Sequence, residues 1–419
     1  MVGTWSILAA VVSLAMSGDS APQPLPPRLL VLTRSYGFEH EVVRRPTAES
    51  TSLVEDVLTQ WGAEEGFEAV LTRGTTEFDP DRLSRYAGVL FFTTGDPPLT
   101  APQRAAFLAA IEAGLGFVGV HSATDTFYSW PEYGALIGGY FDGHPWHEKV
   151  RVRVEDRSHP ATRYLDASFD LVDEIYQFRA PYDRKRVSVL LSLDPETIDV
   201  ARPDVRRTDR DFALAWTREH GRGRVFYTAL GHRPEVWSDP RFSAHLRGGI
   251  AWALRMDRPA PTLSADDERL RTHARLNRGD PALGHAIFRR DSGPMCLRCH
   301  VVHGEGAAVG PDLSRLARTA TREEILEHVL APSAEIARGH GATILELGDG
   351  TLLTGRVLEE NVERLRLADS NGAVRDVALD LVAKRRDSSV SLMPEGLART
   401  LTPTEFADLV AWLETLRGP

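Results

Sequence analysis

The residues Cys296-Leu297-Arg298-Cys299-His300 form a C-x-x-C-H motif and contain the only two cysteines of the 419-residue chain. Two thiols at this spacing can add to both vinyl groups of a haem, and the adjacent histidine then coordinates the iron from the proximal side. A thioredoxin-like pair belongs at a strand-to-helix turn of a βαβ unit, and a structural zinc site usually has four ligands. Neither pattern surrounds this motif. We therefore expect one covalent haem c, with coincidence as the remaining alternative.

The second axial ligand of such a haem is predicted by elimination among the five methionines. Four of them lie in segments that suit a ligand poorly: Met1, Met16, Met256 and Met295. Met393, in the sequence Ser391-Leu392-Met393-Pro394, remains. A thioether raises the reduction potential relative to ligation by two histidines. The alternative is that Met393 only packs and that a histidine coordinates instead, namely His303, His328 or His340.

A second group of reactive side chains lies in the first 240 residues, in loops beside predicted strand ends. Its members are His40, His121, Asp125, His144, His147, Glu174 and His232. His121 directly follows an apolar run, and Asp125 is placed to orient it. Several imidazoles near a carboxylate can bind a divalent metal or do acid–base work near neutral pH. The alternative for each histidine is a role in packing or loop order alone, as we expect for His159.

The elements that must position this group alternate between strand and helix from Arg28 to about Leu254. Four short, continuous apolar runs suit parallel strands covered on both faces, and they are 28–33, 67–72, 88–93 and 115–121. Thr100, Pro102 and Gln103 predict the start of a helix between two of them. Further strands are expected at 149–156, 187–194, 212–217 and 224–230. This order predicts a doubly wound α/β sheet, in which ligands bind at the carboxyl ends of the strands.

The C-terminal part is predicted as a separate unit over 279–419, after a linker at 255–278 in which some helix is compatible with the sequence. Asp280-Pro281 and Thr402-Pro403 are typical of helix starts, and Glu405 completes a capping box with Thr402. Between these two helices, alternating segments separated by Gly-Asp-Gly and Ser-Asn-Gly turns predict a small antiparallel insert at about 341–382.

The N-terminus begins with a short apolar run at residues 5–16, which indicates a signal peptide over residues 1–20. No later stretch approaches the ~18 apolar residues of a spanning helix, so we expect no membrane span in the mature chain. The chain carries 49 Lys and Arg against 59 Asp and Glu, a net charge of -10. This balance argues against a nucleic-acid partner, because such binding needs a basic surface.

The segments GHAIF, CLRCH, GPDL, APSAEIARGHG and SLMP, with the last helix, resemble bacterial c-type haem-binding domains fused to other extracytoplasmic modules. The resemblance covers about residues 279–419. It implies an all-α cytochrome c domain with a β insert, which transfers electrons to or from a redox partner protein. Such haems are attached outside the cytoplasm, so it also implies a periplasmic or otherwise extracytoplasmic location.

The segments GFVGVHSATDTFYSWPEYGALIGGYFDGHPW, SHPAT, DEIYQF and GRGRVFYTALGH resemble the trehalose-utilisation (ThuA-like) family. The resemblance covers about residues 28–254 and implies a flavodoxin-like sheet similar to that of class I glutamine amidotransferases. Those enzymes carry a cysteine nucleophile close to the position of His121. Because both cysteines lie in the haem motif, we expect no glutamine amidotransferase activity.

The same resemblance implies a role in carbohydrate catabolism, with a keto-sugar as one candidate substrate. By motif position it implies catalytic roles for His121, Asp125, His144, Glu174 and His232, and His40 is a further candidate. Four aromatic residues are candidates for stacking on a sugar, although packing would also explain them: Trp130, Tyr140, Trp146 and Tyr176.

Three functions are compatible with these features. The first is an exported fusion whose haem module transfers electrons while the ThuA-like module binds or transforms a carbohydrate. The second is a sugar-binding module without activity that tethers a cytochrome to its redox partner. The third is a hydrolase or isomerase that uses a divalent metal held by the histidines. The sequence leaves open whether the chain is an enzyme.

Overall fold

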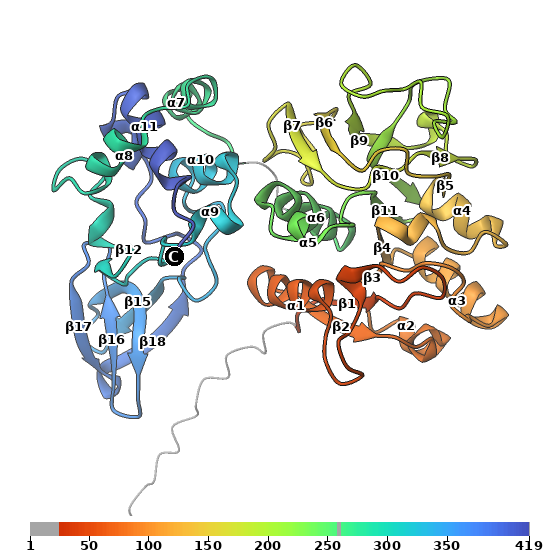
Figure 1. Ribbon diagram of the computed structural model, residues 1–419. Coiled ribbons are helices and arrows are strands. Elements are labelled where there is room, and N and C mark those ends of the chain that lie inside the picture. The colour runs from red at the N-terminus through yellow and green to blue at the C-terminus, as the bar shows by residue number, and fades with distance from the viewer. Residues whose placement is uncertain (1–24, 258–260, 419) are drawn as a thin grey trace, which may run out of the picture.

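The computed structural model describes residues 25–257 and 261–418 (Figure 1). The predicted signal peptide at 1–20 lies outside the described residues, as do positions 258–260 of the predicted linker. An N-terminal α/β region is followed by a C-terminal region that contains helices and a second sheet. Within the described ranges, no helix is both long enough and apolar enough to cross a membrane.

A nine-stranded sheet forms the centre of the N-terminal region, in the order β2-β1-β3-β4-β11-β10-β9-β6-β7. In chain order its strands are β1 (Arg28–Leu32), β2 (Glu68–Thr72), β3 (Gly88–Phe91), β4 (Gly116–Val120), β6 (Lys149–Val154), β7 (Ser168–Val172), β9 (Ser188–Leu193), β10 (Ala213–His220) and β11 (Gly223–Thr228). The first five in the spatial order pair in parallel, and the remaining four extend the sheet in antiparallel fashion. The predicted α/β fold is therefore confirmed, with a larger antiparallel part than a fully parallel sheet would have.

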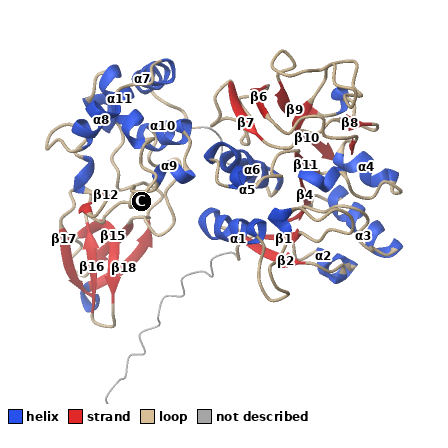
Figure 2. Ribbon diagram, in the orientation of Figure 1, coloured by secondary structure: helices blue, strands red, loops and turns tan. Residues whose placement is uncertain are grey.

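Helices cover both faces of this sheet (Figure 2). Residues of α1 (Leu53–Glu65), α5 (Pro234–Trp237) and α6 (Pro240–Ala253) pack on one face. Residues of α2 (Pro80–Leu83), α3 (Ala101–Glu112) and α4 (Pro131–Ile137) pack on the other. A two-stranded pair, β5 (Tyr140–Phe141) and β8 (Phe178–Arg179), lies beside it. As predicted, Thr100 and Gln103 form a capping box at the start of α3.

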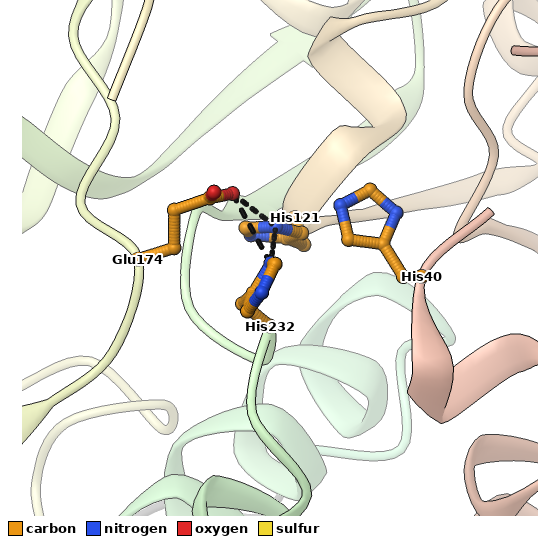
Figure 3. A group of neighbouring side chains, drawn as sticks. All are labelled: His40, His121, Glu174 and His232. Carbon is orange, nitrogen blue, oxygen red and sulfur yellow. Dashed lines mark hydrogen bonds and ion pairs between the residues drawn. The ribbon is translucent and has the colours of Figure 1, made fainter. Parts of the chain in front are cut away.

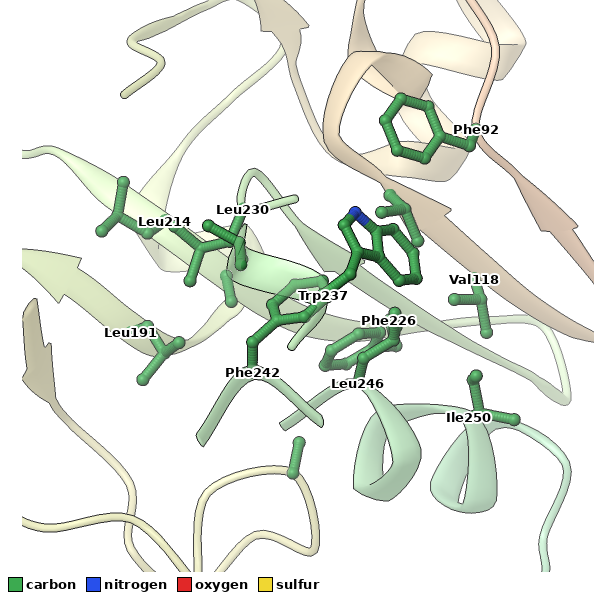
Figure 4. Packing of buried hydrophobic residues seen from close by; sticks show 14 of the residues in the cluster. Phe92, Val118, Leu191, Leu214, Phe226, Leu230, Trp237, Phe242, Leu246 and Ile250 are labelled. Carbon is green, nitrogen blue, oxygen red and sulfur yellow. The ribbon is translucent and has the colours of Figure 1, made fainter. Parts of the chain in front are cut away.

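Two apolar cores follow from the alternation of side chains along each strand. In β1, Leu29 and Val31 enter one core while Leu30 and Leu32 enter the other. Figure 4 shows part of the first core, where Phe242, Leu246 and Ile250 of α6 meet strand residues that include Val118, Leu191, Leu214 and Phe226. The central strands β1, β3 and β4 are apolar throughout because both faces are covered, and β4 ends at His121 of the candidate site.

Five helices form most of a separate core in the C-terminal region, and they are α7 (Ala265–Leu276), α8 (Pro281–Phe288), α9 (Leu316–Thr319), α10 (Arg322–Leu330) and α11 (Pro403–Leu413). The predicted caps at Asp280 and Thr402 are present. α7 occupies part of the segment predicted as a linker, and its Leu270 and Ala274 are buried in the C-terminal core.

A five-stranded antiparallel sheet, ordered β17-β16-β15-β14-β18, occupies the segment predicted as a small insert. Its strands are β14 (Thr343–Leu347), β15 (Leu352–Glu360), β16 (Arg364–Ala368), β17 (Val374–Ala378) and β18 (Val382–Asp387). A short pair, β12 (Val301–Val302) and β13 (Glu305–Gly306), follows the cysteine motif. The expectation of an all-α C-terminal domain is therefore not confirmed, because this sheet has a hydrophobic core of its own around Leu345, Leu365 and Leu367.

Candidate functional site

Two central parallel strands end beside each other and carry the first residues of the candidate site. His121 directly follows β4, and His232 lies four residues after the end of β11, which pairs with β4. Glu174 lies two residues after β7, at the far edge of the sheet, on the chain that runs from β7 towards β8. The carboxyl ends of neighbouring parallel strands are the usual ligand-binding edge of such a sheet.

Four histidines converge on the Glu174 carboxylate. Oε2 lies 3.2 Å from His121 Nε2 and 3.1 Å from His232 Nδ1. Oε1 lies 3.1 Å from His147 Nε2 and 3.6 Å from His144 Nδ1. Figure 3 shows His121 and His232 directed towards the carboxylate, with His40 nearby. The structure thus brings together five of the six predicted catalytic residues, with His147 as an additional member.

The cluster extends from the interior to the surface. The His121 side chain is fully buried and that of Glu174 is 7% exposed, whereas His144 and His147 are 47% and 49% exposed. A ligand arriving from solvent therefore meets His144 and His147 first. The buried histidines lie behind them, on the opposite side of the Glu174 carboxylate.

Burial and charge act in opposite directions on the ionisable groups of the cluster. Burial alone would raise the pKa of Glu174, but hydrogen bonds with His121 and His232 outweigh it and hold the pKa well below its usual range. The hydrogen bond with Glu174 raises the pKa of His232. Burial, followed by the neighbouring His121 and His232, lowers the pKa of His40 to about 3. Glu174 is therefore ionised and His40 neutral at pH 7.

Backbone contact fixes the orientation of His121. Its Nδ1 lies 2.6 Å from the carbonyl oxygen of Ala229. Because a carbonyl only accepts, this nitrogen carries a proton. Nε2, 3.2 Å from Glu174 Oε2, donates to the carboxylate when the ring is protonated and carries a lone pair when the ring is neutral. The Tyr176 hydroxyl lies 2.9 Å from Nε2 and can donate to it. Asp125 does not perform the orienting role expected for it, because its carboxylate instead accepts a hydrogen bond from Tyr128 at 2.5 Å.

Asp173 is a site residue that the sequence did not indicate. It is 1% exposed and accepts hydrogen bonds from the backbone N–H groups of Gly231 and Arg233, at 2.7 and 3.2 Å. These two residues flank His232. Asp173 therefore ties the His232 loop to the residue before Glu174. The only signal available in the sequence was its place in the acidic pair Asp173-Glu174.

The four aromatic residues considered for sugar stacking are all buried, which favours packing: Trp130, Tyr140, Trp146 and Tyr176. The exposed aromatic side chains near the cluster are others. Phe38 is 66% exposed, and its ring lies 4.9 Å from that of His40. Tyr128 is 41% exposed and contacts Asp125. His159 acts within a turn, as expected, by accepting a hydrogen bond from the Ala161 N–H.

The four predicted haem-binding residues line one cavity of about 760 Å³. They are Cys296, Cys299, His300 and Met393. Both cysteines are free thiols. The GPDL segment, Gly310–Leu313, also lines the cavity, as expected. The volume of the cavity lies within the range typical of ligand and cofactor sites, roughly 300–1,000 Å³.

His300 is held in a way that suits metal ligation. Its Nδ1 lies 2.9 Å from the Pro311 carbonyl oxygen, which leaves the lone pair on Nε2. Gly310 packs so closely on the ring that an added Cβ would lie 2.6 Å from His300 Cε1. The donor set in the cavity thus matches a haem held by two thioethers and one imidazole.

Several candidates for the second axial ligand share the cavity with Met393. His328 and His340 line it, whereas His303 is not among its lining residues. Met256 and Met295, which elimination set aside, line it too. The elimination from sequence was therefore incomplete, because Met256, distant along the chain, and Met295, next to Cys296, both line the same cavity.

Residues of the N-terminal region form part of the cavity wall. Tyr164, Arg247, Gly248 and Ala251 line it together with the C-terminal residues. Close to this wall, the Tyr164 hydroxyl donates a 2.9 Å hydrogen bond to Glu327 of α10. α6, which carries three of these lining residues, also contacts α9. The two regions therefore enclose the cavity jointly.

Comparison with known proteins identifies the N-terminal region. Residues 28–253, more than half of the chain, match the protein family ThuA, described as trehalose utilisation. No curated protein matches the chain.

Two solved structures of ThuA-like proteins are similar to this region. One, from Bacteroides uniformis ATCC 8492, is 28% identical, covers 57% of this chain and 97% of its own, and has a TM-score of 0.47. The other, from Parabacteroides merdae ATCC 43184, is 18% identical, covers 57% of this chain and 94% of its own, and has a TM-score of 0.43.

Proposed function

The chain belongs to the ThuA, trehalose utilisation, family, and from this premise we propose that its N-terminal module binds and transforms a carbohydrate at the Glu174 cluster. The observation that carries the proposal is the convergence of four histidines on one buried carboxylate, at 3.1–3.6 Å. A group of imidazoles around an ionised carboxylate can move protons at neutral pH. A carbohydrate-related role is the part that family membership supports directly.

The arrangement suits proton transfer on a sugar hydroxyl or on a carbon next to a keto group. The exposed His144 and His147 meet the substrate, and one of them can take a proton from it as a general base. His232, whose pKa is raised by Glu174, can return a proton as a general acid. Phe38 and Tyr128 offer exposed rings beside the cluster for packing on the sugar. A keto-sugar is the substrate that we propose, because its carbonyl acidifies the neighbouring carbon.

Thiolate chemistry has no part in this proposal. The chain has no cysteine between residues 28 and 253, and His121 stands at the end of β4. The module is therefore proposed to act without the nucleophile that glutamine amidotransferases use.

A screen of sugars and keto-sugars against the purified full chain tests this function. We expect Glu174→Gln and His121→Ala to lower turnover by about 10²–10⁴-fold while ligand binding is retained. His220→Ala, a histidine on β10 outside the cluster, should leave turnover unchanged. Unchanged turnover in both cluster variants would contradict the proposal, and binding without any turnover would support a sugar-binding module instead.

We further propose that the C-terminal region is a c-type cytochrome module. Cys296 and Cys299 would hold a haem covalently, and His300 would coordinate it through Nε2. Met393 is the proposed second ligand, with His328 and His340 as alternatives. A haem in this cavity would supply one-electron transfer. What supports the proposal is that the motif residues line one cavity and that the Pro311 carbonyl fixes the tautomer of His300.

Spectroscopy of denatured protein tests the covalent attachment. A pyridine haemochrome spectrum should show one haem per chain, and Cys296→Ala/Cys299→Ala should remove it. Covalent haem in that variant would refute the assignment. Replacing Met393 with histidine should lower the reduction potential, because Met/His ligation raises it. An unchanged potential would point to His328 or His340.

In the complete proposal, the chain is an exported protein that joins a carbohydrate-active module to an electron carrier. The haem module would exchange electrons with a redox partner protein, such as a dehydrogenase that oxidises the sugar. Haem attachment of this kind is the reason to propose a periplasmic or otherwise extracytoplasmic location. Cell fractionation with an antibody against the full chain tests the location.

A further inference from the structure

The side chains around Glu174 form two groups of potential metal ligands that share this residue. The first group is His40, His121, His232 and Glu174, and the second is His144, His147 and Glu174. In each group the nitrogen and oxygen atoms lie within 4.8 Å of one another. The two groups use different oxygens of the carboxylate, because Oε2 contacts His121 and His232 while Oε1 contacts His144 and His147.

The spacing of three members of the inner group matches a tetrahedral ion. His121 Nε2, His232 Nδ1 and Glu174 Oε2 are separated by 3.1, 3.2 and 3.3 Å. Four ligand atoms at about 2.0–2.1 Å from a central ion lie roughly 3.3 Å from one another. His40, whose ligand atom lies within 4.8 Å of the other three, would supply the fourth ligand on closer approach. The donor set of three imidazoles and one carboxylate is one that zinc accepts.

The backbone leaves one nitrogen of the inner group free to bind a cation. The Ala229 carbonyl holds a proton of His121 on Nδ1, so in the neutral ring Nε2 presents a lone pair towards the carboxylate. A bound ion would replace the proton through which His232 Nδ1 contacts Glu174. The His40 ring turns Nε2 towards the cluster, because Nδ1 lies on the side of the ring away from Glu174 (Figure 3). His40 Nε2 is therefore the nitrogen that could reach an ion held by His121, His232 and Glu174.

Hydrogen bonds hold the histidines of the inner group in position, as hydrogen bonds to ligand residues do in known metal sites. Metal-binding histidines commonly donate their other ring N–H to a backbone carbonyl, as His121 does to Ala229. The His232 loop is held by the two backbone hydrogen bonds to Asp173. The Tyr176 hydroxyl lies 2.9 Å from His121 Nε2 and occupies the lone pair when no ion is bound.

The outer group is open to solvent. His147 Nε2 lies 2.9 Å from His144 Nδ1 and 3.1 Å from Glu174 Oε1. Both histidines are about half exposed. Three protein ligands on one side leave coordination positions free, as in catalytic rather than structural sites.

We propose that Glu174 bridges two divalent transition-metal ions of the zinc class, one held by His40, His121 and His232 and the other by His144 and His147. This inference keeps the proposed carbohydrate function, on which it rests for the identity of the substrate, but replaces the acid–base roles of His144, His147 and His232 with metal ligation. One carboxylate can bridge two ions at the roughly 3.5–4 Å separation of two-metal sites. The outer ion would polarise a sugar carbonyl or hydroxyl, and the inner ion would hold the bridging carboxylate in place.

Metal counting on the full chain tests the inference. The chelator-treated protein is loaded with Zn²⁺, freed of excess by gel filtration and analysed for zinc, while Co²⁺ absorbance reports the coordination of each ion. We expect two equivalents per chain. Full-length Cys296→Ala/Cys299→Ala should also bind two, which excludes the thiols as ligands. Fewer than two equivalents in both proteins would overturn the proposal.

Amino-acid substitutions distinguish the two proposed ion-binding sites. The exposed pair His144→Ala/His147→Ala should lower the count to one with an unchanged circular dichroism spectrum. Glu174→Gln should weaken both sites by at least about 10-fold in Kd. His220→Ala, the matched control, should retain two equivalents. A count that His144→Ala/His147→Ala leaves at the wild-type value would overturn the bridging arrangement.

The outcomes also distinguish this inference from the acid–base proposal. Turnover of a sugar by protein that holds no zinc-class metal would overturn the two-metal site, and it would remain compatible with the proposed acid–base centre. Two bound ions without turnover on any sugar would support the metal site and contradict the catalytic function.

Discussion

The imidazoles of His121 and His300 are fixed by the same device in unrelated parts of the chain. In each ring Nδ1 lies beside a backbone carbonyl, that of Ala229 at 2.6 Å and that of Pro311 at 2.9 Å. A carbonyl cannot become a donor, so the neutral ring keeps its proton on Nδ1 and its lone pair on Nε2. Both histidines are thereby prepared as ligands or bases before anything binds.

Replacing Gly310 with alanine tests how closely the His300 ring is held. The added Cβ would lie 2.6 Å from His300 Cε1 and 2.8 Å from Nδ1, so the ring or the loop must move. We expect a loss of about 1–3 kcal/mol in the free energy of unfolding, measured in urea. The haem absorption spectrum should change as well. Gly341→Ala, where an added Cβ meets nothing within 4 Å, is the matched control and should change neither. Equal stability of the two variants would show that the ring is free to shift.

At the scale of elements, the site depends on loops that leave strands of one sheet. His121 follows β4 and His232 follows β11, which are neighbours in the sheet. Glu174 comes from beyond β7, at the far edge, and its position next to them depends on the path of the chain after that strand. Asp173 secures this path through its hydrogen bonds to the His232 loop.

Asp173→Asn should loosen the loop that carries His232. The two oxygens of Asp173 each accept from one backbone N–H, of Gly231 or Arg233, but the side-chain amide of asparagine has only one acceptor oxygen. One of these buried N–H groups would therefore lose its partner. We expect a cost of about 1–3 kcal/mol in urea unfolding, together with reduced turnover. Asp170→Asn, in the middle of β7, is the control. It removes only surface ion pairs with Lys149 and Arg151, and should cost less than about 1 kcal/mol.

Glu55 connects the start of α1 to the end of β1 and gives a pH-dependent prediction. Its buried carboxylate accepts hydrogen bonds from Arg45 at 2.7 and 2.8 Å and from Thr33 at 2.5 Å. Burial alone would raise its pKa, but these hydrogen bonds lower it below the usual value. A lowered pKa stabilises the fold above the pKa of the unfolded chain, and this contribution is lost as the pH falls through the folded-state pKa.

Glu55→Gln should therefore lower the free energy of unfolding by roughly 1.5–3 kcal/mol at pH 7, and by less as the pH falls below 4. Urea unfolding at several pH values measures this. Glu49→Gln, at an exposed position nearby, should show no such difference. A pH-independent gap between Glu55→Gln and the parent would contradict the assigned role of the carboxylate.

The sequence predicted those elements whose local signals agree with the fold. Continuous apolar runs predicted β1 and β4, and the capping box of Thr100 and Gln103 predicted α3. β7 was missed because its Ser168–Val172 segment is short and alternates polar residues. α7 lies in the segment interpreted as a linker with some helix, because half of its residues are charged and it shows only a narrow apolar stripe.

The composition of the candidate site was predictable by residue type, but its pairings were not. His40, His121, His144, Glu174 and His232 meet as expected. The Ala229 carbonyl, and not Asp125, orients the His121 ring. The sequence could not indicate this contact, because a backbone group has no sequence signal. The sharing of Glu174 between two pairs of histidines depends on where the chain after β7 lies, which no local pattern encodes.

At the scale of the whole molecule, the cavity that holds the cysteine motif lies between the two regions. α6 supports the first apolar core with one side and lines the cavity with Arg247, Gly248 and Ala251. The same helix therefore contacts β11 and β4, which carry His232 and His121, and the cavity of the proposed haem. The two proposed centres are thus connected through one rigid element.

Ala251→Trp tests whether the N-terminal wall shapes the environment of the haem. The larger side chain would enter the cavity from α6, so we expect less covalent haem per chain and a shifted reduction potential. Ala109→Trp, at an exposed position of α3 on the opposite face of the sheet, should change neither. The measurements are the pyridine haemochrome yield and a redox titration. Equal values for the two variants would show that the wall does not influence the cofactor.

The joint wall also has a consequence for the maturation of the chain. Before a cofactor occupies the cavity, partly buried apolar lining residues such as Leu316 and Leu392 of the C-terminal region have no ligand to cover them. Filling the cavity stabilises only the arrangement in which both regions are docked, by the same mass-action linkage that couples any ligand to the state that binds it. Unfilled chains should accordingly open more often at this junction and be cut there first by proteases.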